Sequence, residues 1–401
     1  MDFDFSPEQQ AFAEEVERFL DDNDDPDVFD LTRENMAQIV DTPKRRAFMA
    51  SLGERGWLGM TWPKEYGGSE GEGVYEYLLN ERLAARGGPQ IGKGVGIIGK
   101  TLIAHGNDFL KQKFLPMILR NEVEFAVGYS EPNAGSDAAS MRLKAERAER
   151  DGKTGWVLNG QKTWTTSAHF AEWYWLGTRT DPDDKHRGIT LMLVPLDQPG
   201  VEIRAIWTMG DERTNEVFID DVFVPDEYVV GEVGRGFQYI SQALDLERFT
   251  MFTISPIQQR LDLLCEYVDS ATRDGQPLRD DPVIRQRIAR LVTEAEVARV
   301  LGLRVVAASI KAEKIAGAPP PTVESSQYKL FATELSRRIA DASMDIAGPG
   351  SQLRVKTKEA PMEGRAESTY RYTVIDTIGG GASEIQKNVI ARRGLGLPKN
   401  F

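Results

Sequence analysis

The spacing of apolar residues divides the chain into three zones. Up to about residue 125, apolar side chains recur at steps of three and four, which is the spacing of one helix face. Between about 126 and 237, short runs rich in branched and aromatic residues alternate with turn residues. From about 238 onward the helical spacing returns. The pattern predicts a multi-domain α+β protein: an N-terminal α-helical domain (1–125), a central β-barrel or sandwich (126–237) and a C-terminal α-helical domain (238–401).

The first predicted helix has a clear start signal. Ser6 is a candidate N-cap, Pro7 occupies the first helical position, and Gln9 completes a capping box. The apolar residues that follow keep to helical spacing: Phe12, Val16, Phe19 and Leu20. We therefore expect a helix that begins at Pro7.

Two dipeptides in the middle zone are typical of hairpin turns. Asp151-Gly152 and Asn159-Gly160 both provide residues that tolerate positive φ, which a tight turn between two strands requires. The stretch KTWTTSA is predicted as a strand, so that Trp164 and Thr166 share one face. An aromatic ring beside a hydroxyl can wall and hydrogen-bond a planar cofactor, although a tryptophan packed in the core is the commoner arrangement.

Two glycine-containing stretches are candidate ligand loops. GYSEPNAGSD (128–137) combines backbone N–H groups with hydroxyls, which suits a flavin edge or a phosphate, but a plain surface loop has the same composition. IGGGASEIQ (378–386) places three glycines before a helix-like segment. Its backbone can approach a ligand closely, yet its glycines bring no side-chain chemistry.

Glu247 stands out because it falls on an apolar helical stripe. The stripe consists of Phe237, Ile240, Leu244, Met251 and Ile254. A carboxylate on a core-facing stripe costs free energy unless it is paired or used, and burial raises its pKa toward the range of a general base. A buried ion pair with a distant arginine accounts for the pattern equally well.

Composition narrows the function classes. The net charge of −13 argues against a nucleic-acid partner. A single cysteine excludes a disulfide within the chain, and three histidines make a histidine-based metal site improbable. No apolar run reaches membrane-spanning length, and the N-terminal sequence is acidic. We expect a cytoplasmic protein without a metal.

The chain resembles the flavin-dependent acyl-CoA dehydrogenases through three motifs, which follow one another in this order: SEPNAGSD, KTWTTSA and GGGASEIQKNVIARRGLGLP. The resemblance spans essentially the whole chain. It implies a helical domain, a β domain and a C-terminal four-helix bundle. It also implies FAD as cofactor, a homo-oligomer, usually a homotetramer, and a place in fatty acid metabolism.

The resemblance further implies α,β-dehydrogenation of an acyl-CoA to the trans-2-enoyl-CoA. In the family a glutamate takes the α-proton, the β-carbon passes hydride to flavin N5, and electrons continue to an electron-transferring flavoprotein. Most members carry this glutamate at the position aligned with Gly380. A subset, which includes isovaleryl-CoA dehydrogenases, carries it on a helix in a stretch like LDLER, where Glu247 stands.

The same resemblance assigns the remaining site residues. A backbone N–H at Gly380 would bind the thioester carbonyl. The residues implied in FAD binding are Tyr129, Ser130, Ser136, Trp164, Thr166, Gln286 and Glu384. Those implied in acyl-CoA binding are Ser136, Asp245 and Arg248. The small residues at 379–382 predict room for a branched or bulky acyl group.

Departures from the family pattern leave alternatives open. The segment ATRDGQPLRDDPVIRQ lacks a clean Arg-x-x-Phe, and Arg273 matches only loosely the arginine that contacts the FAD of a neighbouring subunit. This keeps open an FAD-poor partner subunit of a heterotetramer. A flavin monooxygenase or oxidase on the same scaffold is a further alternative, but many of those lack the glutamate that is present here.

Overall fold

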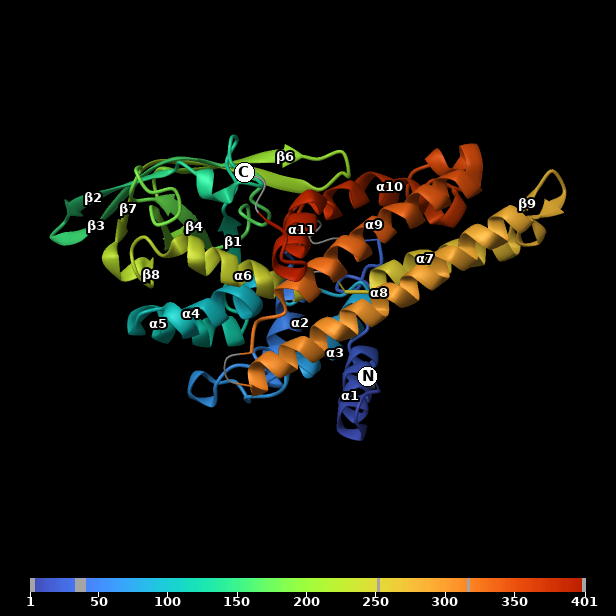
Figure 1. Cartoon of the computed structure of the whole chain (residues 1–401), viewed down its shortest axis with the longest axis horizontal. Helices are drawn as coiled ribbons and strands as arrows, with labels where there is room; N and C mark the ends of the chain where they lie inside the picture. The colour runs from blue at the N-terminus through green and yellow to red at the C-terminus, as the bar shows by residue number, and fades with distance from the viewer. Residues whose placement is uncertain (1–3, 33–40, 251–252, 316–317, 399–401) are drawn as a thin grey trace. The chain divides into compact units, whose positions relative to one another are not determined.

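The computed structural model describes residues 4–32, 41–250, 253–315 and 318–398, except for the side chains of 244–250 and 313. The chain forms two compact units, each assembled from separate stretches of sequence. Unit 1 contains Met1–Asn35, Gly73–Gly88 and Arg248–Phe401, and unit 2 contains Met36–Glu72 and Pro89–Glu247. Figure 1 colours these stretches by position along the chain.

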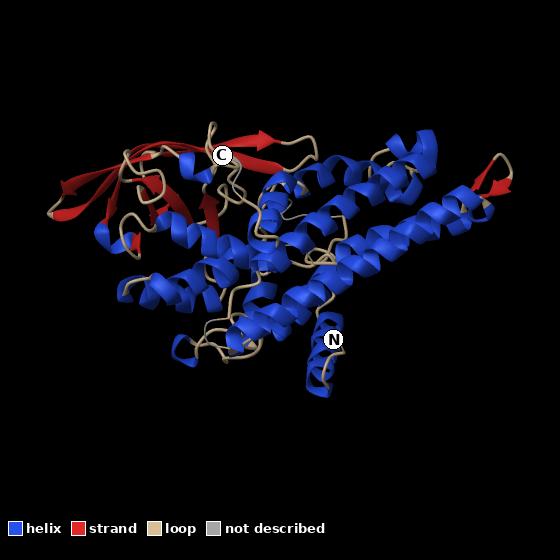
Figure 2. Ribbon diagram, in the orientation of Figure 1, coloured by secondary structure: helices blue, strands red, loops and turns tan. Residues whose placement is uncertain are grey.

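Unit 2 is built around one eight-stranded sheet, drawn red in Figure 2. The strand order is β6-β7-β3-β2-β4-β5-β8, and β1 pairs in parallel with β4. The strands are β1 (Phe125–Gly128), β2 (Lys144–Arg150), β3 (Lys153–Lys162), β4 (Trp173–Arg179), β5 (Ile189–Pro195), β6 (Val201–Trp207), β7 (Arg213–Pro225) and β8 (Val229–Val230). The unit also includes α2 (Pro43–Glu54), α4 (Lys100–His105), α5 (Asp108–Leu119) and the first residues of α6 (Gly236–Thr250).

The two predicted hairpin dipeptides have different outcomes. Asp151 and Gly152 do join β2 to β3, with φ values of 51° and 74°, so this turn is confirmed. Asn159 and Gly160 instead lie inside β3, where the register with β7 shifts between Leu158 and Gly160. That prediction was wrong, because the dipeptide forms an irregularity that a single strand accommodates while it keeps pairing with β7.

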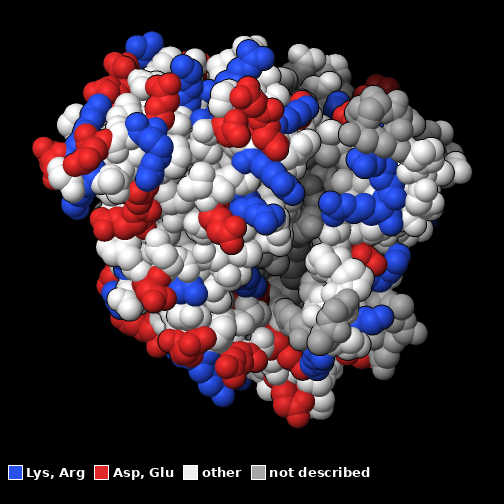
Figure 3. Space-filling model, turned by 60° about the vertical axis from the view of Figure 1, so that its left-hand side comes forward, with Lys and Arg blue, Asp and Glu red and all other residues white. Residues whose placement is uncertain are grey.

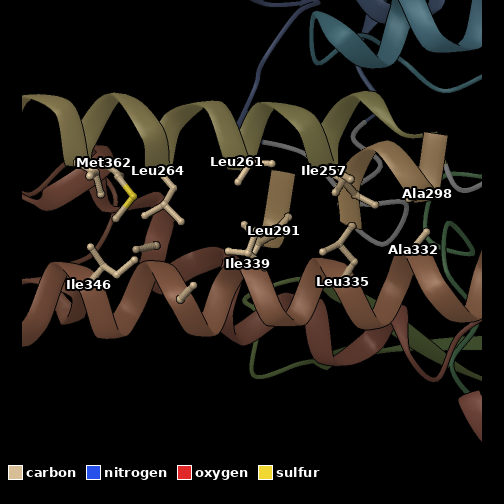
Figure 4. Packing of buried hydrophobic residues seen from close by; sticks show 14 of the residues in the cluster. Ile257, Leu261, Leu264, Leu291, Ala298, Ala332, Leu335, Ile339, Ile346 and Met362 are labelled. Atoms are coloured by element: carbon tan, nitrogen blue, oxygen red, sulfur yellow. The ribbon is translucent and has the colours of Figure 1, made fainter. Parts of the chain in front are cut away.

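Unit 1 is helical. Its elements are α1 (Pro7–Asp22), α3 (Gly73–Ala85), α7 (Ser255–Ser270), α8 (Pro282–Lys314), α9 (Thr322–Ala347), α10 (Arg365–Asp376) and α11 (Ser383–Val389). Figure 4 shows apolar side chains of α7, α8 and α9, among them Leu261, Leu291 and Ile339, pointing toward one another. Burial of these side chains is the main force that holds the long helices together. The expected fold class, two helical domains and a β domain, is confirmed.

The start of α1 agrees with its sequence signal. Ser6 accepts a hydrogen bond from the Gln9 backbone N–H, and the Gln9 side chain accepts one from the Ser6 N–H at 2.9 Å. We expect Ser6→Ala to destabilise this helix by about 1 kcal/mol, because an orphan N–H loses its acceptor. Faster hydrogen exchange of the first-turn amides would show the loss. Ser6→Gly should cost only a few tenths of that, and equal exchange in all three proteins would contradict the capping role.

No helix in the described part of the chain is long and apolar enough to cross a membrane. The charged surface is mixed in sign: on the face drawn in Figure 3, acidic and basic side chains are interspersed. Exposed ion pairs such as Lys185 with Asp137, at 2.7 Å, belong to this mixed surface.

Candidate functional site

The two motif loops of unit 2 meet at their first residues. The 128–137 loop begins at the end of β1, and the 163–167 loop begins directly after β3 ends at Lys162. The Thr163 backbone N–H donates to the Ser130 carbonyl at 3.0 Å. This bond sets Ser130 beside the turn that carries Trp164, although the two residues are far apart in sequence.

Trp164 adopts an unusual conformation for a large residue. Its φ is 56°, and 58% of its surface is exposed. The predicted strand at this point was wrong, because β3 ends at Lys162 and Thr166 N–H turns back to the Trp164 carbonyl at 3.1 Å. A core tryptophan is also ruled out. An exposed indole held in left-handed backbone is strained, and such strain is concentrated at functional sites.

The other predicted residues of these loops differ in burial. Tyr129 is half-buried, and its hydroxyl accepts from Trp175 Nε1 at 2.8 Å, which orients the ring. Ser130 and Thr166 are half-buried as well. Ser136 is exposed, farther along the 128–137 loop.

A buried ion pair connects the 128–137 loop to the end of β3. Lys162 Nζ lies 2.8 Å from Glu131 Oε1, and their side chains are 0% and 8% exposed. Glu131 also accepts from the backbone N–H groups of Arg142 and Leu143, at 2.6 and 2.9 Å. Burial lowers the pKa of the Lys162 ammonium to about 8, an effect that the neighbouring Glu131 carboxylate opposes.

Sequence reasoning missed this pair. A signal was present, because Lys162 lies an even number of residues after the buried Trp156 and Leu158 of β3, with the exposed Gly160 between them, and so has the parity of the inward-facing side chains. A lysine in such a series needs a buried partner, and the glutamate of the motif loop supplies it.

The glycine stretch of unit 1 forms a turn whose carbonyls are held by buried side chains. Gly380 and Gly381 have φ values of 64° and 96°, which favour glycine. Lys329 Nζ donates to the Asp376 and Gly381 carbonyls at 2.8 and 3.0 Å. Gln386 Nε2 donates to the Gly380 and Gly381 carbonyls at 3.1 and 2.9 Å. The turn is therefore fixed from two sides, and Glu384 is exposed in the first turn of α11.

Replacing Gln386 by Leu should lower the free energy of unfolding by about 1–3 kcal/mol, because the Gly380 carbonyl loses a buried donor. Thermal denaturation checks this. Lys387→Met, an exposed neighbour on the same helix, provides the control and should have little effect. Equal midpoints for the two variants would contradict a structural role for the Gln386 amide.

The segment implied in FAD binding between subunits has its own contacts. β9 (Thr272–Arg273) and β10 (Gln276–Pro277) form a small hairpin before α8. Arg273 Nη2 donates to the Ile346 carbonyl at 2.6 Å, so its guanidinium helps to hold the end of α9. Gln286 is exposed on α8.

The predicted base lies on α6, but its side chain is outside the described residues, as are those of Asp245 and Arg248. The apolar stripe needs one correction. α6 ends at Thr250, and Ile254 is the N-cap of α7, so the stripe does not continue along one helix to Ile254. Ile240, which is 1% exposed, does face the core as predicted.

The residues of the joined loops fit a flavin. An exposed indole offers an aromatic face, and the half-buried hydroxyls of Ser130 and Thr166 offer hydrogen bonds to a polar ring edge. Within the described ranges, His, Cys, Asp and Glu form no cluster of three or more suited to a metal.

Three family models match successive parts of the chain. The N-terminal, middle and C-terminal domains of acyl-CoA dehydrogenases match residues 6–122, 126–222 and 234–395. Acyl-CoA dehydrogenase FadE26 of Mycobacterium tuberculosis is 34% identical over 360 residues and covers 88% of each chain. Acyl-CoA dehydrogenase IpdE1 of Mycolicibacterium smegmatis is 35% identical over 411 residues and covers 98% of each.

Comparison with solved structures indicates the same family. The ChsE4-ChsE5 complex from Mycobacterium tuberculosis matches with a TM-score of 0.86 and 31% identity over 100% of both chains. The Tcur3481-Tcur3483 steroid ACAD matches with a TM-score of 0.86 and 29% identity, also over 100% of both. The predicted family is confirmed: the chain belongs to the FAD-dependent acyl-CoA dehydrogenases.

Proposed function

We propose that this protein oxidises an acyl-CoA thioester to the trans-2-enoyl-CoA. The observation that carries the proposal is the backbone bond between Thr163 and Ser130, which unites the two loops that bear Ser130, Trp164 and Thr166. Tyr129, Ser130, Trp164 and Thr166 bind the flavin ring. Gln286 and Glu384 contribute further cofactor contacts, and Ser136 contacts both the cofactor and the acyl-CoA.

Bound FAD supplies the acceptor for the hydride that leaves the β-carbon. Glu247 removes the α-proton. Its place in the sequence, three residues after Leu244 on the apolar stripe, supports this role, because burial among apolar residues raises a carboxyl pKa toward neutrality. Asp245 and Arg248, on the same helix, hold the thioester and pantetheine arm.

The Gly380 N–H binds the thioester carbonyl and stabilises the negative charge that develops there. Such preorganised donors contribute roughly 3–4 kcal/mol each in hydrolases. Support comes from the rigidity of the turn, in which Lys329 and Gln386 hold the surrounding carbonyls. A donor that is already fixed costs no reorganisation when charge develops.

A bulky acyl group is the proposed substrate class. The turn at 379–382 carries no side chain larger than a methyl group, and a similar solved structure is described as a steroid ACAD. A small-residue turn leaves volume that a ring system can fill. Straight short chains that turn over clearly faster than branched or steroid-like ones would reject this class.

A second candidate is a subunit of a heteromeric enzyme. One hydrogen bond favours it, because the Arg273 guanidinium donates to the Ile346 carbonyl within its own chain. A similar structure is described as a complex of ChsE4 with ChsE5. In either case the proposed electron acceptor is an electron-transferring flavoprotein.

An anaerobic titration tests the proposal. The purified protein should show a flavin spectrum that bleaches when a suitable acyl-CoA is added, and the panel should include straight, branched and steroid-like chains. A flavin-bound protein that no acyl-CoA bleaches would contradict the dehydrogenase activity. A colourless protein that becomes yellow only with a second subunit would favour the heteromeric form.

A further inference from the structure

Asn215 is a fully buried polar residue near the start of β7, outside both motif loops. Its backbone carbonyl accepts from the Thr165 N–H at 2.9 Å. Its side-chain Nδ2 donates to the Thr165 carbonyl, also at 2.9 Å. One residue thus binds both backbone groups of Thr165, which lies between Trp164 and Thr166.

The remaining contacts of the Asn215 amide fix which way it points. Arg213 Nε donates to Oδ1 at 3.1 Å, and because a guanidinium only donates, the oxygen must face Arg213. Nδ2 then faces the Thr165 carbonyl and His169 Nδ1, which lies 3.1 Å away. Because the amide Nδ2 can only donate, His169 Nδ1 is the acceptor, in the tautomer that carries its proton on Nε2. Both donors and the acceptor of the amide are in use.

The loop that Asn215 holds is strained on both sides of the contact. Trp164 and Ser167 have φ values of 56° and 74°, and neither is glycine. Such backbone conformations are strained in residues other than glycine, and they persist only where the surrounding structure over-determines them. Thr165 supplies that constraint: it is 0% exposed, and its Oγ1 shares a 2.8 Å hydrogen bond with the Tyr174 hydroxyl.

We propose that Asn215 is a positioning residue for FAD binding, which acts through Thr165 to hold Trp164 and Thr166 in the conformation that the flavin meets. The inference rests on the proposed function, since it assigns the 163–167 loop to the flavin. Asn215 is 0% exposed, so we expect it to act without touching the cofactor. Asn215 holds the loop in its FAD-binding conformation before FAD binds, so that less conformational entropy is lost when the cofactor binds.

Asn215→Asp is the sharpest test because the side chain keeps its shape. The change removes both Nδ2 donors and sets a carboxylate oxygen against the Thr165 carbonyl. Amides of the 163–167 loop should exchange at least tenfold faster in the FAD-free variant, and the Kd for FAD should rise at least tenfold, because one lost hydrogen bond alone accounts for about tenfold. The visible flavin band should shift, while KM for the acyl-CoA stays within about twofold.

Two further variants separate positioning from simple damage to the sheet. Asn159→Ala removes another asparagine of the same sheet, whose Oδ1 accepts from the Asp221 N–H at 2.9 Å, and it should leave FAD affinity and the flavin band unchanged. Tyr174→Phe removes only the hydroxyl partner of Thr165 and should loosen the loop in the same direction as Asn215→Asp. It also remains informative if the aspartate variant does not fold.

The outcomes distinguish this inference from the proposed function. A wild-type protein that binds no FAD, alone or with a second subunit, overturns both. A wild type that binds FAD, with Asn215→Asp and Tyr174→Phe matching its Kd, spectrum and exchange rates, overturns only the role of Asn215. Variants that exchange faster but bind FAD as tightly as the wild type also overturn it.

Discussion

Replacing Glu247 by Gln should lower kcat for acyl-CoA oxidation by about a thousandfold. The amide has the size of the carboxylate but cannot accept a proton, and a positioned general base contributes roughly 10²–10⁴ to the rate. FAD content and KM should change little, because the substitution leaves the flavin loops untouched. Stopped-flow bleaching of the flavin by acyl-CoA measures the chemical step directly.

Two comparisons make this result specific. Glu232→Gln removes an exposed carboxylate just before α6 and should retain the wild-type rate. Adding Gly380→Glu to Glu247→Gln places a carboxylate at the position most family members use. Recovery should be partial at best, because Gly380 has a φ of 64° that costs an L-residue about 1 kcal/mol or more. Wild-type bleaching by Glu247→Gln alone would show that another group is the base.

Replacing Lys162 by Met should lower the free energy of unfolding by about 3–5 kcal/mol. The change leaves the Glu131 carboxylate buried without its cation, and uncompensated buried charges carry costs of this size. Because Glu131 anchors the backbone at Arg142 and Leu143, the 128–137 loop should also lose order. Denaturant unfolding gives the free energy, and FAD binding reports the state of the loop.

Matched variants locate the cause. Lys185→Met breaks an exposed pair with Asp137 in the same region, and exposed pairs contribute only about 0–1 kcal/mol. The double variant Glu131→Leu, Lys162→Met should be more stable than Lys162→Met, since it leaves no unpaired charge. If Lys162→Met and Lys185→Met unfold at the same denaturant concentration, the buried pair has no special role.

Local sequence signals predicted the elements whose determinants are local. The capping box at Ser6 and Gln9 and the turn at Asp151 depend only on residues within a few positions, and both are confirmed. Asn159-Gly160 has the same local signal as a turn, but β3 continues through it because β7 pairs with both sides. Pairing with β7 determined the structure at Asn159-Gly160, and the sequence of β3 alone does not indicate which strand it pairs with.

The same distinction applies to the site. Motif order identified the loops that contain Ser130 and Trp164, yet it did not predict that a backbone bond joins them or that Trp164 is exposed in left-handed backbone. Asn215 and Lys162 escaped notice because each acts on residues about thirty to fifty positions away. Their roles depend on a three-dimensional arrangement that spacing along the chain does not encode.

The discontinuous make-up of unit 1 has a consequence for biosynthesis. Ala13 of α1 packs with Val74 and Leu78 of α3 and with Val306 of α8. During translation the first three of these residues leave the ribosome long before Val306 is made, whereas every residue of unit 2 precedes Arg248. We therefore expect unit 2 to become compact first. The apolar faces of α1 and α3 should stay exposed until the C-terminal stretch of unit 1 has been synthesised. A chaperone that shields those two helices would have its longest opportunity during that interval.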